Sequence, residues 1–468
     1  MELTAQFTAE ACGGGLRGPG DIVFKGVSTD SRTTAPGELF VALDGPRFHG
    51  EDFLPAAMAR GAAGALLARP VEGLPADFPV VVVEDTLEAL GALANAWRRA
   101  LNPIVVAVSG SAGKTTTKEM TAALMNGAAP VLATEGNKNN LVGLPQTLLR
   151  LRPEHRFAVV ELGMNRPGEL LRLTEIAAPD AVVMTNIGNA HIGNFGSEEC
   201  LVRAELEVLD ALDGHEVVFF NADCPVLSAH LRQAEAPFLL TPFGREAISQ
   251  VGIEDVSPID PVGYRMVLRV GEERRALELP LFGEYQVSNV WAAASVAHYY
   301  GVGIDRIASR LGNFTAPALR SDAEWIGGVL VVKDCYNASP DPMLRAIASF
   351  RKLRGVKRRF ALLGDMYELG EFTARFHEVV GRAAAEGGLD GLFAVGEHTV
   401  DTVREAARGG LLAVHCADST EAARLLASEL REGDALLVKG SRANRLEQAV
   451  ERLRAGLAAA DMLEVDAT

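Results

Sequence analysis

Short apolar runs recur along the chain, and most are followed by a segment with the spacing of an amphipathic helix. The clearest run, Ile-Val-Val-Ala-Val-Ser at 104–109, breaks at a glycine and leads into helix formers over 114–125. A run that is apolar at nearly every position is typical of a buried parallel strand. We expect further strands at 37–43, 79–83, 157–160, 181–185, 217–220, 329–332, 360–363, 392–395 and 435–438.

Helical periodicity fills several of the intervals between these strands. It covers 53–60, 87–99, 168–177 and 201–212, whereas 250–280 is β-like, with alternation over 264–270. Strands that alternate with helices predict an α/β fold with largely parallel sheets.

The chain is too long for one hydrophobic core. With 468 residues, we expect about three domains. The segment 313–317, Asn-Phe-Thr-Ala-Pro, has turn chemistry and no periodicity, which indicates a boundary. We predict a small α/β domain over 1–100, a central domain with a mostly parallel sheet over 101–313, and a Rossmann-like domain over 314–468. The last domain has no G-x-G-x-x-G sequence, so no dinucleotide is expected there.

The loop after the strand at 104–109 has the features of a phosphate cradle. Its glycines let the backbone wrap closely around phosphate groups, and the first amides of the next helix point toward them. Lys114 supplies positive charge, and the hydroxyl of Thr115 or Thr116 can ligate magnesium. Val108 replaces the first glycine of G-x-x-x-x-G-K-[ST], and a turn with a solvated lysine is the alternative. We expect a triphosphate at Gly110, Ser111, Ala112, Gly113, Lys114, Thr115 and Thr116.

Two polar residues follow strands of the central domain. Glu161 ends the strand at 157–160, and His191 follows the strand at 181–185. Because the helix at 168–177 joins these strands, we expect them to be parallel neighbours whose carboxyl ends lie beside the phosphate loop. Glu161 and His191 are therefore candidate metal-site residues. Taken singly, each would be assigned as a structural or solvated side chain.

Three polar loops are candidates for substrate contacts. Residues 134–140, Thr-Glu-Gly-Asn-Lys-Asn-Asn, form a turn by composition, but their position after the first β-α unit is expected to bring them within reach of the phosphates. In the first domain, the loops at 28–32 and 45–50 are turns with solvated charges unless a ligand is present. A diphosphate would give Arg32 and Arg47 a function, since guanidinium groups match phosphate geometry.

Composition narrows the classes of function. The formal net charge of −16 argues against nucleic acid as the main partner, because binding to a phosphate backbone needs a basic face. Five widely separated cysteines without a C-x-x-C pair indicate reduced thiols rather than a zinc site or a disulfide framework. The sequence contains no apolar run long enough to span a bilayer and no signal-peptide pattern at its start. We expect a cytoplasmic monomer without a membrane partner.

Seven motifs, spread over nearly the whole chain, carry a family resemblance. Four lie in the central domain: the phosphate loop at 110–116, T-x-G-N-x-N-N-x-x-G-x-P at 134–145, E-L-G at 161–163 and H-x-x-x-F-G-S at 191–197. Three lie in the last domain: Tyr-Asn-Ala at 336–338, Gly-Asp-Met with Glu-Leu-Gly at 364–370, and Val-Lys-Gly-Ser-Arg at 438–442. In this combination the chain resembles the Mur ligases, and the last three motifs resemble the branch that joins D-alanyl-D-alanine to UDP-N-acetylmuramoyl-tripeptide. The D-N-P-R string of the branch that adds the third amino acid does not occur.

The resemblance implies a three-domain ligase of peptidoglycan precursor synthesis. The first domain would hold the UDP moiety, the second ATP and magnesium, and the third the incoming dipeptide. A carboxylate of the tripeptide would attack the γ-phosphate of ATP, and the dipeptide amine would then attack the acyl phosphate.

The resemblance also assigns residues. It implies catalytic roles for Lys114, Glu161 and His191, metal contacts for Thr115, Glu161 and His191, and nucleotide contacts for Asn289, Arg320, Asp334, Tyr336 and Asn337. Substrate contacts are implied for Ser28, Thr29, Asp30, Ser31, Arg32, Arg47, Phe48, Asn137, Asn139, Asn140, Lys439, Ser441 and Arg442.

Two positions depart from the family pattern. The residues before Asn289 include Tyr285-Gln286 where the family has His-Asn, so only Asn289 carries over. The lysine that relatives carbamylate as a second magnesium ligand corresponds to Glu205. Arg203 cannot replace it, because a guanidinium stays protonated and does not take up carbon dioxide. We hypothesise that Glu205 supports a second magnesium without a bicarbonate requirement; the alternative is a surface helix residue.

Two other classes of function compete with this assignment. One is another ligase of the superfamily, such as folylpolyglutamate synthetase or an enzyme that adds a different residue to the muramyl chain. The other is a switch or binding module that hydrolyses ATP without joining anything. That module would leave Glu161, His191 and the motifs of the last domain unexplained together. The sequence does not define the third residue of the tripeptide, the oligomeric state or the extent of domain closure.

Overall fold

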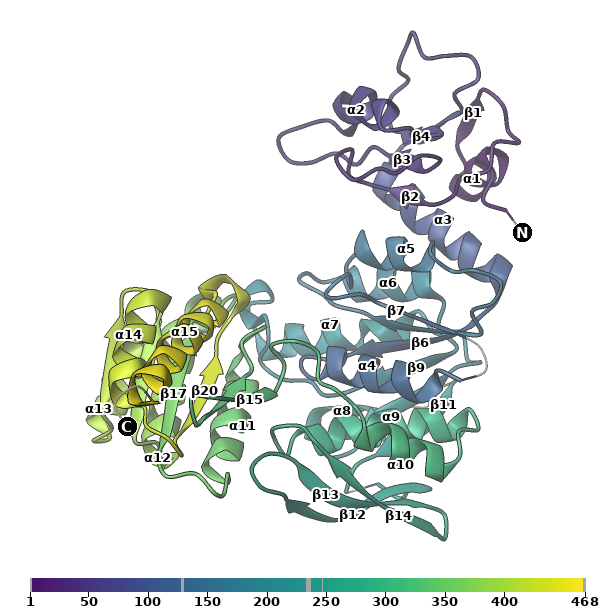
Figure 1. Ribbon diagram of the computed structural model, residues 1–468. Helices are drawn as coiled ribbons and strands as arrows, with labels where there is room; N and C mark the ends of the chain where they lie inside the picture. The colour runs from purple at the N-terminus through teal and green to yellow at the C-terminus, as the bar shows by residue number, and fades with distance from the viewer. Residues whose placement is uncertain (1, 128–129, 233–236, 246, 466–468) are drawn as a thin grey trace.

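In the described residues, four β-sheets follow one another along the chain. The computed structural model describes residues 2–127, 130–232, 237–245 and 247–465. In Figure 1 the amino-terminal part lies above the central part, and the carboxyl-terminal part lies beside it. The α/β fold with largely parallel sheets is confirmed. The domain boundaries at 100/101 and 313/314 fall between sheets and stay predictions.

The amino-terminal part is a five-stranded sheet in the order β1-β5-β4-β3-β2, parallel except for the β1–β5 pair. The long helix α3 is capped at its amino terminus by Asp85, whose carboxylate accepts from the amides of Leu87 and Glu88. It packs against α1 and also against α5 and α6 of the central part. The elements are α1 (Ala5–Cys12), β1 (Gly15–Arg17), β2 (Val27–Ser28), β3 (Leu39–Val41), η1 (Gly50–Phe53), α2 (Leu54–Ala59), β4 (Gly64–Leu67), β5 (Val80–Val82) and α3 (Thr86–Leu101).

The central part is built on a six-stranded parallel sheet in the order β11-β10-β9-β6-β8-β7. Its elements are β6 (Ile104–Ser109), α4 (Lys114–Met125), β7 (Val131–Ala133), α5 (Gly143–Leu148), β8 (Phe157–Glu161), α6 (Glu169–Ala177), β9 (Ala181–Met184), η2 (Ile192–Asn194), α7 (Glu198–Asp210), β10 (Val217–Asn221), α8 (Pro225–Leu231) and β11 (Leu239–Phe243).

The prediction that β8 and β9 are direct neighbours is wrong. Both strands pair with β6, which lies between them. A crossover helix fixes the parallel direction of the strands it joins but can carry the chain past an intervening strand. The carboxyl ends of β8 and β9 nevertheless lie beside the phosphate loop as expected, because β6, β8 and β9 are parallel and end at one edge of the sheet.

A small antiparallel sheet lies at the end of the central part that is distant from the amino-terminal part (Figure 1). It contains β12 (Val251–Pro258), β13 (Tyr264–Val270) and β14 (Glu273–Leu279). The predicted alternation is present in β13, where Tyr264 and Met266 are buried and Arg265 between them is exposed. Helix α9 (Gln286–Tyr299), buried over most of its surface, packs against α4 and this sheet, and α10 (Ile304–Gly312) follows it.

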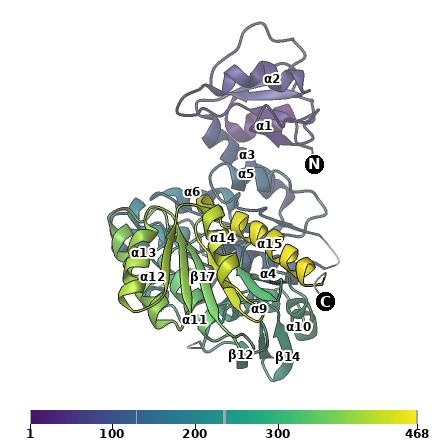
Figure 2. The ribbon, with the colours of Figure 1, turned by 60° about the vertical axis from the view of Figure 1, so that its left-hand side comes forward.

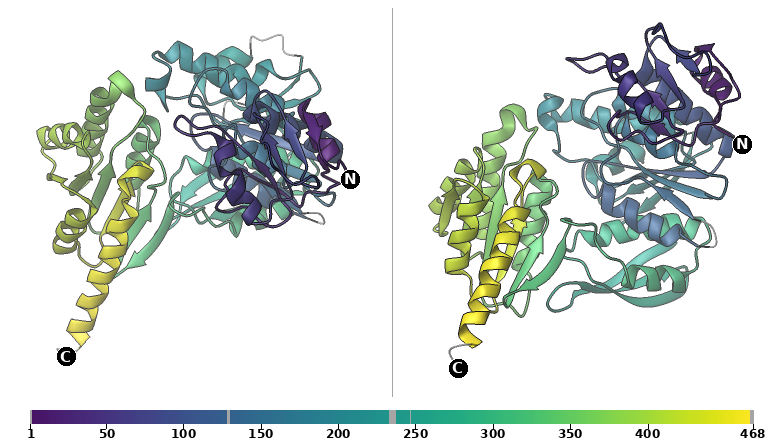
Figure 3. Two further views of the ribbon diagram at one scale, coloured as in Figure 1. Left: turned by 90° about the horizontal axis from the view of Figure 1, so that it is seen from above. Right: turned by 45° about the horizontal axis from the view of Figure 1, so that its top comes forward.

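The carboxyl-terminal part is a six-stranded sheet in the order β15-β16-β20-β17-β18-β19, in which only β15 runs antiparallel to its neighbour. Helices cover both faces (Figure 2), and α15 runs along this part to the carboxyl terminus, away from the amino terminus (Figure 3). Its elements are β15 (Asp322–Ile326), β16 (Val329–Lys333), α11 (Pro340–Arg351), β17 (Arg359–Gly364), η3 (Gly370–Phe372), α12 (Thr373–Glu386), β18 (Gly391–Val395), α13 (Thr399–Arg408), β19 (Ala413–Cys416), α14 (Ser419–Glu429), β20 (Ala435–Lys439), η4 (Arg442–Asn444) and α15 (Glu447–Val465). No helix within the described ranges combines the length and apolarity needed to cross a bilayer.

A buried histidine fixes the Gly-Asp-Met motif of this part. His377 on α12 is 1% exposed, its Nδ1 donates to the carbonyl of Thr373 at 2.8 Å, and its Nε2 accepts from the amide of Met366 at 3.2 Å. One ring nitrogen therefore donates and the other accepts, which is the neutral imidazole. Burial lowers the pKa of His377 below its usual 6.5.

Acid should therefore destabilise this part through His377. The unfolded chain takes up the proton first, so the stability is fully present above pH 6.5 and is lost progressively as the pH falls from there to the folded pKa. His377→Gln should flatten the drop in melting temperature between about pH 7.5 and about pH 5.5 in calorimetry. Replacement of the exposed His215 by Gln is the control and should keep the wild-type drop. A full drop in His377→Gln would contradict this assignment.

Candidate active site

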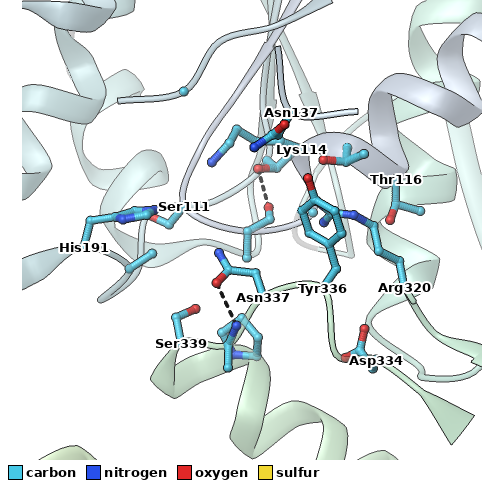
Figure 4. A pocket seen from close by; sticks show the side chains of 18 of the residues that line it. Ser111, Lys114, Thr116, Asn137, His191, Arg320, Asp334, Tyr336, Asn337 and Ser339 are labelled. Carbon is cyan, nitrogen blue, oxygen red and sulfur yellow. Dashed lines mark hydrogen bonds between the residues drawn. The ribbon is translucent and has the colours of Figure 1, made fainter. Parts of the chain in front are cut away.

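A cavity of about 520 Å³ lies at the carboxyl edge of the central sheet, between the central and carboxyl-terminal parts (Figure 4). It collects side chains from motifs that are far apart in the sequence. The predicted residues that line it are Ser111, Ala112, Gly113, Lys114, Thr115, Thr116, Asn137, Asn139, Asn140, Glu161, His191, Asn289, Arg320, Asp334, Tyr336, Asn337, Lys439, Ser441 and Arg442.

The phosphate loop requires both of its glycines. Gly110 and Gly113 have φ of +124° and +82°, which L side chains rarely adopt. A Cβ at Gly110 would lie 2.3 Å from the hydroxyl of Thr185, and one at Gly113 would lie 2.6 Å from Oδ1 of Asn289. Gly110 is not among the residues that line the cavity, and its carbonyl accepts from Nζ of Lys114 at 2.5 Å.

Asn186 shapes this loop, although it was not among the site residues that the sequence predicted. Its carbonyl accepts from the amide of Ser111 and its Oδ1 accepts from the amide of Ala112, both at 2.9 Å. Its position directly after β9, at the edge that carries the loop, is the signal that could have identified it.

Glu161 is the centre of the hydrogen bonds on the other side of the loop. Its side chain is buried, with 3% of the residue exposed. Oε2 accepts from the hydroxyl of Thr115 and Oε1 accepts from the amide of Asn139, both at 2.7 Å. Of the two predicted threonines, Thr115 is thus the one beside the carboxylate. A hydroxyl and a carboxylate are hard oxygen ligands of the kind that Mg²⁺ takes, so the residues fit this ion.

His191 approaches from the loop after β9, and its Nδ1 pairs with the carboxylate of Glu368 from the carboxyl-terminal part. Within the described ranges, no group of three or more His, Cys, Asp or Glu side chains is arranged to hold a metal. Glu161 and His191 would thus need hydroxyl, phosphate or water oxygens to complete a coordination sphere, which is the habit of Mg²⁺ in nucleotide sites.

Glu205 is buried, with 4% of the residue exposed, so the alternative of a surface helix residue is wrong. It follows Leu201 and precedes Val208 on the buried face of α7, at helical spacing. Oε1 accepts from the hydroxyl of Ser111 at 2.8 Å. Burial raises the pKa of Glu205, and the charges of Lys114 and His191 together with the Ser111 hydrogen bond oppose the shift.

Tyr285 and Gln286, which stand where the family has His-Asn, join the two parts. The hydroxyl of Tyr285 lies 2.8 Å from Oγ of Ser321, and the side-chain amide of Gln286 donates to the same oxygen at 3.0 Å. Oε1 of Gln286 accepts from the amide of Asn289 at 2.7 Å. Both residues line the cavity, and their place one turn before Asn289 was the available signal.

Residues from the carboxyl-terminal part form the opposite wall. The guanidinium of Arg320 lies over the ring of Tyr336, 4.0 Å from its centroid. Lys439 is buried, and its Nζ donates to Oδ2 of Asp334 at 2.7 Å and to the carbonyl of Asn337 at 3.2 Å. Lys439 therefore holds Asp334 in place, and its predicted contact with substrate stays a prediction.

The predicted residues of the amino-terminal part lie outside this cavity. Arg32 pairs with Asp30 at 2.7 Å, and the ring of Phe48 packs edge-on against Phe53. Oγ1 of Thr29 accepts from the side-chain amide of Gln146 at 2.7 Å, which ties this loop to the central part. Substrate roles for Ser28, Thr29, Asp30, Ser31, Arg32, Arg47 and Phe48 stay predictions.

Comparison with known proteins matches three family models in sequence. The model "Mur ligase family, catalytic domain" covers residues 23–98, "Mur ligase middle domain" covers 108–297, and "Mur ligase, glutamate ligase domain" covers 322–442. The UDP-N-acetylmuramoyl-tripeptide–D-alanyl-D-alanine ligase of Bacillus subtilis is 33% identical over 463 residues, which are 97% of this chain and 98% of that protein. The chain belongs to the Mur ligase family. The ligase of the same name from Escherichia coli is 33% identical to this Mur ligase over 460 residues, 97% of this chain and 99% of the relative.

Solved structures agree with this Mur ligase fold. MurF from Acinetobacter baumannii superposes with a TM-score of 0.88 at 31% identity, covering 97% of this chain and 99% of the other. The MurF ligase from Thermotoga maritima in complex with ADP has a TM-score of 0.82 at 27% identity, covering 93% and 98%. A relative that binds ADP on this fold agrees with a nucleotide site at the phosphate loop.

Gly113→Ala should weaken binding of ADP. The new Cβ would meet Asn289 at 2.6 Å, in addition to left-handed strain of about 1–2 kcal/mol. We expect the dissociation constant, measured by isothermal titration, to rise about tenfold or more, which corresponds to about 1.4 kcal/mol.

Gly168→Ala is the matched control for this variant. Gly168 has a similar φ of +86°, and a Cβ added there would meet nothing within 4 Å. Gly168→Ala should therefore have a similar backbone strain without a steric clash, and its ADP affinity should equal that of the wild type. An equal loss of affinity in both variants would show that the effect comes from general destabilisation.

Proposed function

We propose that this Mur ligase joins D-alanyl-D-alanine to UDP-N-acetylmuramoyl-tripeptide in an ATP-driven reaction of peptidoglycan precursor synthesis. The observation that carries the proposal is the single cavity in which the phosphate loop and Glu161 face Tyr336, Asn337 and Ser441 of the branch-specific motifs. The names of the relatives that match over nearly the whole chain support the same substrates.

The phosphate loop holds ATP with its terminal phosphoryl group toward the cavity. Lys114, which folds back onto the Gly110 carbonyl, is long and flexible enough to turn toward the outer phosphates and neutralise their charge. A carboxylate of the tripeptide attacks the γ-phosphate to give an acyl phosphate and ADP, and the dipeptide amine then displaces phosphate. Thr115, Glu161 and His191 would hold Mg²⁺, which when bound supplies positive charge to the transferred phosphoryl group.

Placement of the cavity between two parts suits this chemistry. An acyl phosphate hydrolyses if water reaches it, so the carboxyl-terminal part must cover the nucleotide before the first step. Tyr285 and Gln286 already join that part to the central one through Ser321. The loops at 28–32 and 47–48 would hold the uridine diphosphate at the far end of the substrate. We place the reaction in the cytoplasm and expect a monomer.

Glu205 would support a second magnesium in place of the carbamylated lysine of relatives. Its carboxylate is buried beside the phosphate loop and held by Ser111. A carboxylate encoded in the sequence supplies the negative charge that carbamylation would otherwise create. The residue does not itself line the cavity, so water would bridge it to the ion.

Turnover should therefore be independent of carbon dioxide. We expect equal rates in carbon-dioxide-free buffer and in the same buffer with bicarbonate, whereas Glu205→Lys should gain a bicarbonate requirement. The measurement is ADP release in a coupled assay. A wild-type rate that recovers only when bicarbonate is added would contradict the role of Glu205.

A panel of amines tests the proposed substrates. With ATP and UDP-N-acetylmuramoyl-tripeptide, D-alanyl-D-alanine should drive ADP release, and D-glutamate, lysine and diaminopimelate should not. Equal ADP release without any amine would favour a hydrolytic switch, and release with glutamate on a folate would favour folylpolyglutamate synthetase.

Lys114→Ala should lower the rate of ligation about 10²- to 10³-fold, since it removes a preorganised charge at the transferred phosphoryl group.

A further inference from the structure

Two short turns from different parts of the chain lock together beside the cavity. The first is 191–195, which contains η2, and the second is 368–372, which contains η3; we call the pair the clasp. The amide of Gly193 donates to the carbonyl of Glu368 at 2.9 Å, so a backbone hydrogen bond joins the central part directly to the carboxyl-terminal part.

The clasp depends on close backbone approach. A Cβ at Gly193 would lie 2.3 Å from the amide nitrogen of Gly370 and 2.5 Å from the carbonyl carbon of Leu369. These neighbours are main-chain atoms, which cannot move aside as a flexible side chain would. The two turns can therefore meet only because position 193 has no side chain.

Two residues of the clasp hold an unusual backbone conformation. His191 and Glu368 have φ of +62° and +63°, a left-handed region that residues with a Cβ rarely adopt. Their side chains pair with each other through Nδ1 of His191 and Oε2 of Glu368. Such conformations persist only where the surrounding structure holds them, and here both partners of one contact between the two parts adopt them.

We propose that Glu368 is a positioning residue for His191. By holding Nδ1 from the carboxyl-terminal part, it orients the ring so that Nε2 is left for a ligand in the cavity, and it does so only when the two parts are closed. Figure 4 shows the His191 side chain directed toward Ser111 and the phosphate loop. A carboxylate on the outer nitrogen is the usual way in which a ligating histidine is held. Domain closure thereby becomes a condition for a competent site.

One half of this inference rests on the proposed function, since Nε2 matters only if His191 serves the ATP site. The other half, that Glu368 holds the clasp closed, needs neither metal nor nucleotide. The test therefore begins with the protein alone, so that failure of the ligase assignment does not affect it.

Hydrogen exchange at Gly193 reports closure of the clasp, because its amide bonds across the two parts. In protein free of nucleotide and metal, Glu368→Ala should speed exchange of this amide about tenfold or more, the effect of losing a charged hydrogen bond. Glu368→Gln keeps an acceptor for Nδ1–H and should stay within about twofold of wild type. Glu371→Gln changes an exposed carboxylate on the same turn and should have no effect.

Magnesium dependence tests the positioning role. Glu368→Ala should raise the Mg²⁺ concentration for half-maximal ligation about 10- to 100-fold and lower kcat more than it raises KM for the dipeptide. In a His191→Ala background the same change should add almost nothing, because the two residues act as one unit.

Three results would overturn the proposal. If exchange of the Gly193 amide is unchanged in Glu368→Ala, then Glu368 does not hold the clasp closed. Faster exchange with an unchanged Mg²⁺ requirement would limit Glu368 to a structural contact. Additive effects of Glu368→Ala and His191→Ala would show that the two residues act separately.

Discussion

The hydrogen-bonded carboxylate of Glu161 is the interaction on which the rest of the site depends. It connects the phosphate loop through Thr115 with the asparagine-rich loop through Asn139. Its own amide donates to the hydroxyl of Thr134, whose carbonyl accepts from the ammonium of Lys118 at 2.5 Å. Lys118 is fully buried and also pairs with Glu119. Each buried polar group here has a hydrogen-bond partner. Removal of one side chain would leave its partner buried without a hydrogen bond, at a cost of about 1–3 kcal/mol.

A second constraint is that an acidic chain must hold an anionic nucleotide. The net charge of −16 repels ATP at long range, so attraction must come from groups at the cavity itself. Lys114, Arg320 and Arg442 line it, as do Thr115 and Thr116 of the first turn of α4, where backbone amides have no acceptor within the helix. Lys439 forms an ion pair with Asp334, so it holds a wall of the cavity in place and adds no uncompensated positive charge.

The sequence predicted single strands and the motifs at their ends, and it missed contacts between the central and carboxyl-terminal parts. Apolar runs such as 104–109 and 435–438 became β6 and β20, because a strand buried on both faces needs nothing but its own composition to be recognised. Spatial order was harder, since β6 lies between β8 and β9 although it precedes both along the chain. Glu161 and the phosphate loop followed from their place at strand ends.

Asn186 was missed although its partners Ser111 and Ala112 lie in the same part of the chain. The other missed residues have partners in another part. Tyr285 and Gln286 meet Ser321, and Glu368 meets His191, across the boundary between the central and carboxyl-terminal parts. No periodicity or composition encodes such a contact. Only the resemblance to the Mur ligases pointed to these regions. It identified the motifs but not which of their residues contact one another.

The role proposed for Glu205 would link its burial to cation binding. A carboxylate taken out of water favours its protonated form, and the raised pKa of Glu205 expresses that cost. A cation that enters the cavity near Ser111 lowers the cost, because it restores part of the lost solvation by direct or water-bridged attraction. Cation binding and stability of the loop around Ser111 must then rise together, since a ligand that favours the folded site stabilises it by mass action. In the proposed role, the carboxylate that is costly to bury on its own would make the loop respond to its ligand.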